Sequence, residues 1–111
     1  METVVKNFSK PDNYVDLEKI SIDFCKLCSC GISRMIVKPG WRWSTCMKPI
    51  IKTDWCLATH IGVLTQGQLH VVMKDGTEYD IKEGECYEIQ PEHDGWIIGD
   101  QEAIGFEFKQ D

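Results

Sequence analysis

The feature that most constrains this chain is a regular alternation between short β-forming segments and turns that contain glycine. The segments are rich in β-branched, aromatic or cysteine residues, and no stretch shows a convincing amphipathic helix. They span residues 19–26, 31–38, 57–65, 68–74, 77–82, 85–90, 95–99 and 102–109. This spacing predicts an all-β protein. A jelly roll, an up-and-down barrel and an immunoglobulin-like sandwich all fit it.

Glycine and proline mark the turns between these segments. The turn sequences are Pro39-Gly40, Gln66-Gly67, Asp75-Gly76, Glu83-Gly84 and Gly99-Asp100. Asp75-Gly76 predicts a tight hairpin, because both residue types tolerate positive φ. Residues 7–17 contain the sequence Pro-Asp-Asn and predict an N-terminal arm with a turn.

Composition and charge exclude several classes of function. A chain of 111 residues is enough for one domain with a single core. Its net charge of −6, without a Lys/Arg cluster, argues against nucleic acid as a partner. No apolar run approaches the roughly 20 residues that cross a bilayer, so no membrane partner is expected. The first residues, METVVKNFSKPD, lack the basic and apolar parts of a signal peptide, and we therefore expect a cytoplasmic protein.

The cysteines form one cluster that superficially suggests zinc. Cys25, Cys28 and Cys30 make a CxxCxC sequence, but a closed zinc site needs four ligands and no second pair follows. On a strand, Cys28 and Cys30 would point one way and Cys25 the other. Disulfides are rare in the cytosol. We expect core or surface thiols here, with a metal or redox role as the alternatives.

The glycine and proline spacing of residues 39–96 resembles the two motifs of the cupin superfamily, G-x5-H-x-H-x3–4-E-x6-G and G-x5-P-x-G-x2-H-x3-N. His60 stands seven residues before Gly67, where the first motif has its glutamate. The wider string, from PGWRWSTCMKPI through HIGVLTQG to VVMKDGTEY, is similar to small bacterial single-domain cupins. The resemblance implies a double-stranded β-helix (jelly-roll) barrel of residues 18–111, preceded by an arm of residues 1–17.

The second motif is present with its ligand displaced. Gln90 falls where the motif has its first proline, and Glu92 falls where it has its glycine. The motif histidine would be Gly95, and His93 lies two residues earlier. A histidine in a loop at a barrel mouth can meet metal or substrate. The alternative is a surface turn in which Asp94 caps the backbone and His93 is incidental.

Strand parity predicts that His60 faces the interior. If residues 66–67 form a two-residue hairpin turn, Leu64 opposes Leu69 and His60 opposes Met73, and opposed residues share a face. The predicted interior face consists of His60, Gly62, Leu64, Leu69, Val71 and Met73. A buried imidazole needs a partner. His60 is therefore either a group that contacts metal or substrate, or a core histidine bonded to a carbonyl or water.

Other polar and aromatic side chains receive less specific predictions. His70 opposes Val63 on the other face, which predicts a surface or interface histidine rather than a ligand. The tryptophans flank the expected mouth of the barrel, and we expect two to serve packing and leave a pocket role open for the others. They are Trp41, Trp43, Trp55 and Trp96.

The two histidines of the first cupin motif are missing from this chain. Counting forward from Gly40 places Cys46 and Lys48 at the two ligand positions, whereas counting back from His60 places Asp54 and Cys56 there. Either count leaves one cysteine at a ligand position. The candidate metal ligands are therefore His60, His93, Cys46 and Cys56. A Cys/His/His set suits Zn, Fe or Cu. It is not the His/His/Glu/His set of metal-dependent cupins. The loss of two imidazoles and a carboxylate should weaken oxygen-activating iron chemistry in particular.

The resemblance implies a protein that binds a small-molecule ligand in the barrel interior, with a divalent transition metal (Zn, Fe, Ni, Cu or Mn) or with none. One alternative is a metal-dependent enzyme of the dioxygenase, isomerase or lyase type. Another is a non-catalytic sensor or dimerisation module. Because cupins commonly pair through an edge strand or arm, a homodimer is expected. No catalytic residue or substrate can be named from these residues.

Overall fold

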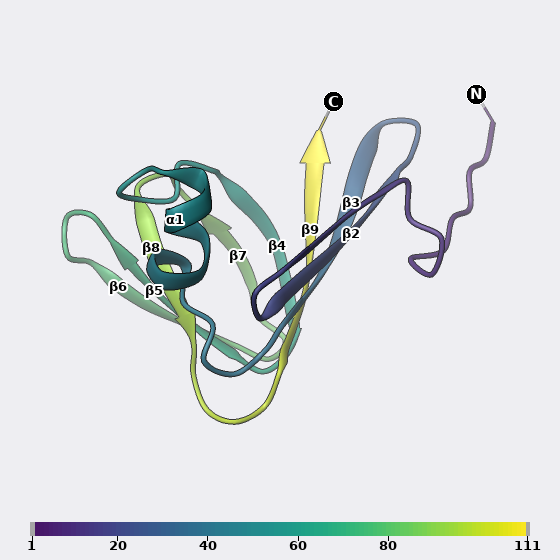
Figure 1. Cartoon of the computed structure of the whole chain (residues 1–111). Helices are drawn as coiled ribbons and strands as arrows, with labels where there is room; N and C mark the ends of the chain where they lie inside the picture. Colours follow the sequence, from purple (N-terminus) through teal and green to yellow (C-terminus); the bar gives the residue numbers. More distant parts are fainter. Residues whose placement is uncertain (1, 111) are drawn as a thin grey trace.

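A computed structural model describes residues 2–110 as two antiparallel β-sheets that face each other across one core (Figure 1). The first half of the chain contains β1 (Asn13–Leu17), β2 (Ile20–Lys26), β3 (Cys30–Val37), the π-helical turn η1 (Trp43–Met47) and α1 (Lys48–Ile51). The second half contains β4 (His60–Gln66), β5 (Gln68–Met73), β6 (Glu78–Lys82), β7 (Cys86–Ile89), β8 (His93–Ile97) and β9 (Ala103–Gln110). The prediction of an all-β protein is therefore confirmed.

The two sheets differ in size. The larger has six strands in the order β1-β2-β3-β9-β4-β7, and the smaller has three in the order β6-β5-β8. Every strand pair is antiparallel. Figure 1 shows the short helical segment beside β5 and β8, with β2, β3 and β9 on the side away from it. Strands β6 and β7 each end a sheet, and their edges frame an opening into the space between the sheets.

The predicted strands correspond one to one with β2 to β9, with ends that differ by a few residues. The structure adds β1, which lies in the segment expected to form an arm and pairs with β2. The turn of this segment comes earlier than its Pro-Asp-Asn sequence suggests, where the Lys10 N–H donates to the Asn7 carbonyl at 3.0 Å. Strand β1 was missed because it has only five residues, and the first of them, Asn13, belongs to those turn formers.

The Asp75-Gly76 hairpin is confirmed, but the hairpin expected at Gly67 is wrong. Strands β5 and β6 pair around Asp75-Gly76, and Gly76 has a φ of 92°. Gly67, with a φ of 87°, instead lies where the chain passes from one sheet to the other. Strand β4 pairs with β7 and β9, so His60 opposes Ile89 rather than Met73.

The predicted interior face is nevertheless correct for its apolar members, because the inner faces of both sheets meet in the same core. Leu64 and Val71 are buried there, and Leu69 and Met73 pack against them. The buried members of the core are Ile20, Val37, Leu64, Val71, Ile81, Ile89, Ile97 and Ala103. They come from both sheets, so the core fills the space between the layers.

Within the described residues, helix is confined to the connection between β3 and β4. Helix α1, which follows η1 directly, has a proline in its first turn and is capped at its C-terminal end by Lys52, whose φ of 65° is left-handed. It is too short to show the period of an amphipathic helix, which explains why no helix was expected. Within residues 2–110, no helix is long and apolar enough to span a membrane.

Candidate metal centre

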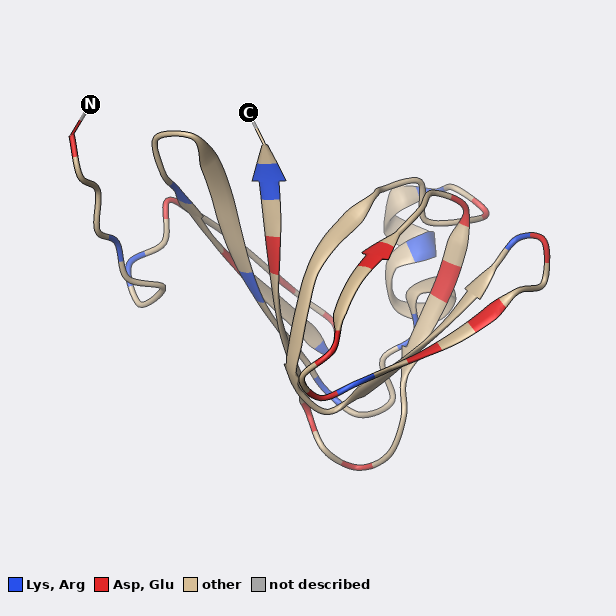
Figure 2. Ribbon diagram, turned by 180° about the vertical axis from the view of Figure 1, so that it is seen from behind, with Lys and Arg blue, Asp and Glu red and all other residues tan. Residues whose placement is uncertain are grey.

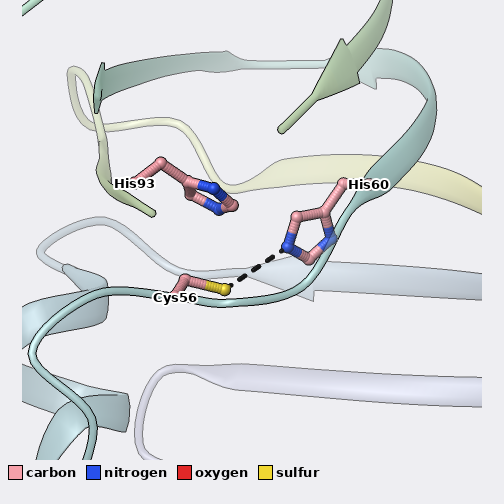
Figure 3. A group of neighbouring side chains, drawn as sticks. All are labelled: Cys56, His60 and His93. Atoms are coloured by element: carbon pink, nitrogen blue, oxygen red, sulfur yellow. Dashed lines mark hydrogen bonds between the residues drawn. The ribbon is translucent and has the colours of Figure 1, made fainter. Parts of the chain in front are cut away.

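Three side chains from separate segments converge between the sheets: Cys56, His60 and His93 (Figure 3). Cys56 precedes β4, while His60 and His93 are the first residues of β4 and β8. The Cys56 N–H donates to the His93 carbonyl at 2.8 Å, which fixes the loop before β4 against β8. The backbone pairing of Cys56 with His93 therefore brings their side chains close to each other.

The spacing of their donor atoms suits a single metal ion. The Cys56 sulfur and one ring nitrogen from each histidine lie within 4.8 Å of one another. Cys56 Sγ is 3.6 Å from His60 Nε2. Zinc bond lengths of about 2.3 Å to sulfur and about 2.0 Å to nitrogen would separate two tetrahedral ligands by roughly 3.5 Å. The two imidazole rings meet edge to face, with centroids 5.2 Å apart. This donor set fits zinc.

The outer nitrogen of each imidazole is already engaged. His60 Nδ1 donates to Glu107 Oε1 at 2.7 Å, and His93 Nδ1 donates to the Gln90 carbonyl at 2.6 Å. Each Nδ1 thus carries its proton, and in the neutral ring Nε2 holds the free lone pair. Histidines that bind metals almost always have their other nitrogen anchored by a carboxylate or carbonyl in this way.

Glu107 is the functional residue that sequence reasoning missed. It is 9% exposed. One of its oxygens accepts a hydrogen bond from His60 Nδ1, and the other accepts a hydrogen bond from the Tyr87 hydroxyl at 2.8 Å. It lies on β9, 47 residues from His60 and outside both cupin motifs. The available signal was its inward parity in β9, which puts a carboxylate on the face shared with Ala103 and Gly105.

Electrostatics in this group favour a thiolate beside an imidazolium when no metal is bound. Burial raises the pKa of the Cys56 thiol, but hydrogen bonds from His60 and His93 outweigh burial and lower that pKa from 9.0 to about 6. Burial disfavours charge on His60, yet hydrogen bonds with Cys56 and Glu107 raise its pKa from 6.5 to about 9. Burial and the adjacent Glu107 carboxylate raise the pKa of Tyr87, which keeps its hydroxyl neutral and able to donate.

Cys46, the other cysteine considered as a ligand, lies outside this group. It is buried in η1, and its sulfur is 3.8 Å from Thr45 Oγ1. The loop before β4 instead brings Cys56 beside His60. Asp54, which the same backward count placed at a ligand position, is exposed and lies 3.4 Å from the Lys48 ammonium.

The CxxCxC residues also lie apart from the candidate metal centre. Cys25 is buried near the end of β2, Cys28 is exposed in the turn, and Cys30 begins β3. The turn between the strands separates these residues, so the single-strand geometry assumed from the sequence does not apply.

His70 lies on the outer face of the small sheet, as parity predicted. Its two ring nitrogens donate to Asp80 at 2.6 Å and to Glu78 at 2.7 Å, so it is held as an imidazolium. Hydrogen bonds with these carboxylates raise the pKa of His70. Its ring stacks against Trp96, and the Arg42 guanidinium lies 4.3 Å from the centroid of that indole.

A cleft lies beside Cys56, His60 and His93 without including them. It has a volume of about 320 Å³ and opens between β6 and β7. Two lining residues pair with the histidines across strands: Met73 opposes His93, and Ile89 opposes His60. None of the tryptophans lines this cleft, and Trp41 and Trp43 instead pack in or against the core.

Comparisons with known proteins identify the architecture. No known protein family and no curated protein matches the sequence. Among solved structures, ectoine synthase from P. lautus matches with a TM-score of 0.69 and 13% identity, over 97% of this chain and 78% of the other. KdgF from Halomonas sp. matches with a TM-score of 0.65 and 12% identity, over 100% and 96%.

A cupin-like protein from Thermotoga maritima matches with a TM-score of 0.56 and 14% identity, over 82% of this chain and 68% of the other. The chain has a cupin fold. Identities this low show the fold alone. The cupin jelly roll expected from the glycine spacing is therefore confirmed, and any particular chemistry must be argued from this chain's own residues.

Proposed function

We propose that this cupin binds one zinc ion through Cys56, His60 and His93, and a small molecule beside it. The observation that carries the proposal is the convergence of one thiol sulfur and two imidazole nitrogens. Both imidazoles are held by a hydrogen bond from their other nitrogen, Nδ1. A thiolate with two imidazoles suits zinc better than oxygen-activating iron, which uses two histidines and a carboxylate. Three protein ligands leave one coordination position open.

In that position zinc would supply Lewis acidity or an activated water. The chain's own residues have separate parts. Glu107 orients His60 and stabilises its protonated form, Tyr87 orients Glu107, and the Gln90 carbonyl orients His93. Binding a metal requires the thiolate of Cys56 and a neutral His60, so loading should release a proton from the imidazolium.

Metal analysis of protein purified without an affinity tag tests the proposal. After exposure to zinc and dialysis, the wild-type chain should retain about one equivalent, as a three-ligand site does. Cys56→Ser and His60→Ala should retain far less, whereas Cys46→Ser should match the wild type. Cys46 is an apt control because it is equally buried but lies outside the group. Wild-type protein with under about a tenth of an equivalent would contradict the metal site.

A second candidate function is enzymatic and uses Cys56 as a nucleophile. It is favoured by the chain of hydrogen bonds from Glu107 to His60 to the Cys56 sulfur, a base and orienting group of the kind that activates thiols. Zinc and alkylating reagents would compete for the same sulfur. If zinc fails to protect Cys56 from iodoacetamide while the thiol reacts rapidly, the nucleophile is favoured over the metal ligand.

We also propose that the protein is a cytoplasmic homodimer, with residues 1–17 as the pairing arm. All six cysteines are free in residues 2–110, which suits a reducing compartment. Strand β1 is an edge of the large sheet, and Tyr14 and Val15 on it are 70% and 40% exposed. An exposed edge that carries apolar side chains favours pairing with a second copy.

A further inference from the structure

The cleft between β6 and β7 has apolar walls and is large enough for a small molecule. Its volume of about 320 Å³ falls at the lower end of the range for ligand sites. Val71, Ile81 and Ile89 belong to the core and contribute to its wall, together with Met73. Tyr79 and Tyr87 are its aromatic residues. Such walls favour a ligand with an apolar or aromatic body.

The charge of the cleft has one sign. Three carboxylate residues line it, and no Lys, Arg or His among residues 2–110 does so. Asp80 is paired with His70 at 2.6 Å. Glu85 accepts a backbone N–H from Lys82, and Glu88 accepts the Gln90 amide, but neither carboxylate forms an ion pair within the described chain.

Two uncompensated carboxylates beside a small cleft would repel an anion and attract a cation. Figure 2 shows acidic residues along this end of the molecule, away from the two chain ends. The tyrosine rings add a surface that attracts an organic cation through its π electrons.

We propose that this cleft binds a small organic amine with an apolar or aromatic body. The inference deepens the proposed small-molecule role by naming the class of ligand, and it rests on that role. Hydrogen bonds connect the cleft to the proposed metal centre, because Tyr87 lines the cleft and donates to Glu107, the residue that anchors His60. A ligand packed against Tyr87 therefore sits one hydrogen bond from the carboxylate that orients a metal ligand.

Matched probes of different charge test the ligand class. In a ¹⁵N–¹H NMR titration, phenethylamine should shift backbone signals of residues 79–90. The neutral 2-phenylethanol should shift the same signals at higher concentration, and 3-phenylpropionate should leave them unchanged. Equal or tighter binding of 3-phenylpropionate would overturn the proposal, and so would amine-induced shifts confined to residues outside the cleft.

Two double variants test whether the cleft carboxylates are the groups that bind the amine. Glu85→Gln with Glu88→Gln should weaken phenethylamine binding about fivefold, as expected for two partly exposed charges. Glutamine keeps the oxygen that accepts the Lys82 N–H, so the turn should be preserved. The control, Glu83→Gln with Asp100→Asn, removes the same net charge at two exposed residues outside the cleft. Equal weakening in both double variants would show a general charge effect and overturn the assignment.

One more measurement distinguishes a failure of this inference from a failure of the metal proposal. Phenethylamine should still bind Cys56→Ser, because Cys56 does not line the cleft. If the wild type retains zinc but no amine enters the cleft, the cleft inference alone fails. If zinc is absent while the amine binds both proteins, the metal proposal alone fails.

Discussion

At the scale of single residues, Glu107 connects the chemistry of the candidate centre to the rest of the barrel. One of its oxygens holds His60 and the other accepts from Tyr87. A carboxylate in that place fixes the imidazole tautomer and stabilises its positive charge. The metal affinity of the centre should therefore depend on a residue that does not touch the metal.

Glu107→Gln should lower zinc affinity by about 10–100-fold, because the anchor of a ligating histidine becomes a neutral amide. Tyr87→Phe should have a smaller effect, because it removes one hydrogen bond to Glu107 and leaves the His60 contact. Competition with a chromophoric chelator measures both. An affinity that Glu107→Gln leaves unchanged would contradict the role of the anchor.

The thiol of Cys56 should titrate near neutral pH in metal-free protein. Its pKa is lowered to about 6, so the rate of alkylation by iodoacetamide should be high above that pH and fall as pH drops through it. In His60→Ala the hydrogen bond is lost and burial remains, so the midpoint should move upward. Mass spectrometry of the peptide that contains Cys56 distinguishes it from the exposed Cys28 and Cys86. If His60→Ala leaves the midpoint unchanged, the His60 imidazole does not lower the pKa of the Cys56 thiol.

At the scale of secondary-structure elements, the junction between β4 and β5 determines how the sheets are assigned. Gly67 adopts a left-handed φ and lies against Ala103, the start of β9, which is 1% exposed. This junction sends β5 into the small sheet and leaves His60 on the large one. His60 on β4 and His93 on β8 therefore lie on different sheets.

Gly67→Ala should destabilise the fold by about 3 kcal/mol, as positive φ and a steric clash both disfavour a side chain there. An added Cβ would lie 2.8 Å from the Ala103 Cα atom. Gly99→Ala is the matched control, because its φ of 84° is similar but its Cβ would meet nothing within 4 Å. That variant should cost about 1 kcal/mol. Urea denaturation compares them, and equal losses would show that the contact with Ala103 is unimportant.

At the scale of the whole molecule, the elongated shape follows from the unequal sheets and from the N-terminal segment that extends beyond them (Figure 1). The principal extents are 45 × 28 × 27 Å, and β1, β2 and β3 extend the large sheet beyond β9 (Figure 1). The outermost edge is β1, with its exposed Tyr14 and Val15. The proposed dimer is a prediction about this edge.

Light scattering should give about twice the chain mass of 12.8 kDa for the full chain, as expected for a closed pair. A chain that begins at Glu18 should be a monomer. Tyr14→Asp with Val15→Asp keeps the strand length and should also give a monomer, whereas Leu57→Asp, at a residue 60% exposed elsewhere, should stay dimeric. A dimer that persists without residues 1–17 would exclude the arm from the interface.

The sequence by itself determined the strands and the inward parity of their apolar residues. These follow from alternation and turn chemistry, which act over a few neighbouring residues. The glycine spacing also sufficed for the cupin fold, and it directed attention to His60 and His93. Strand β1 was missed because its five residues gave too little pattern beside strong turn formers.

Only the tertiary structure decided which cysteine meets these histidines, which carboxylate anchors His60, and which sheet receives β5. Each of these depends on strand pairing between distant segments. The bridge between Cys56 and His93 selects Cys56 over Cys46, and the pairing of β4 with β9 brings in Glu107 from 47 residues away. Local patterns carry no information about such pairing, because it is determined by how both sheets bury one shared core.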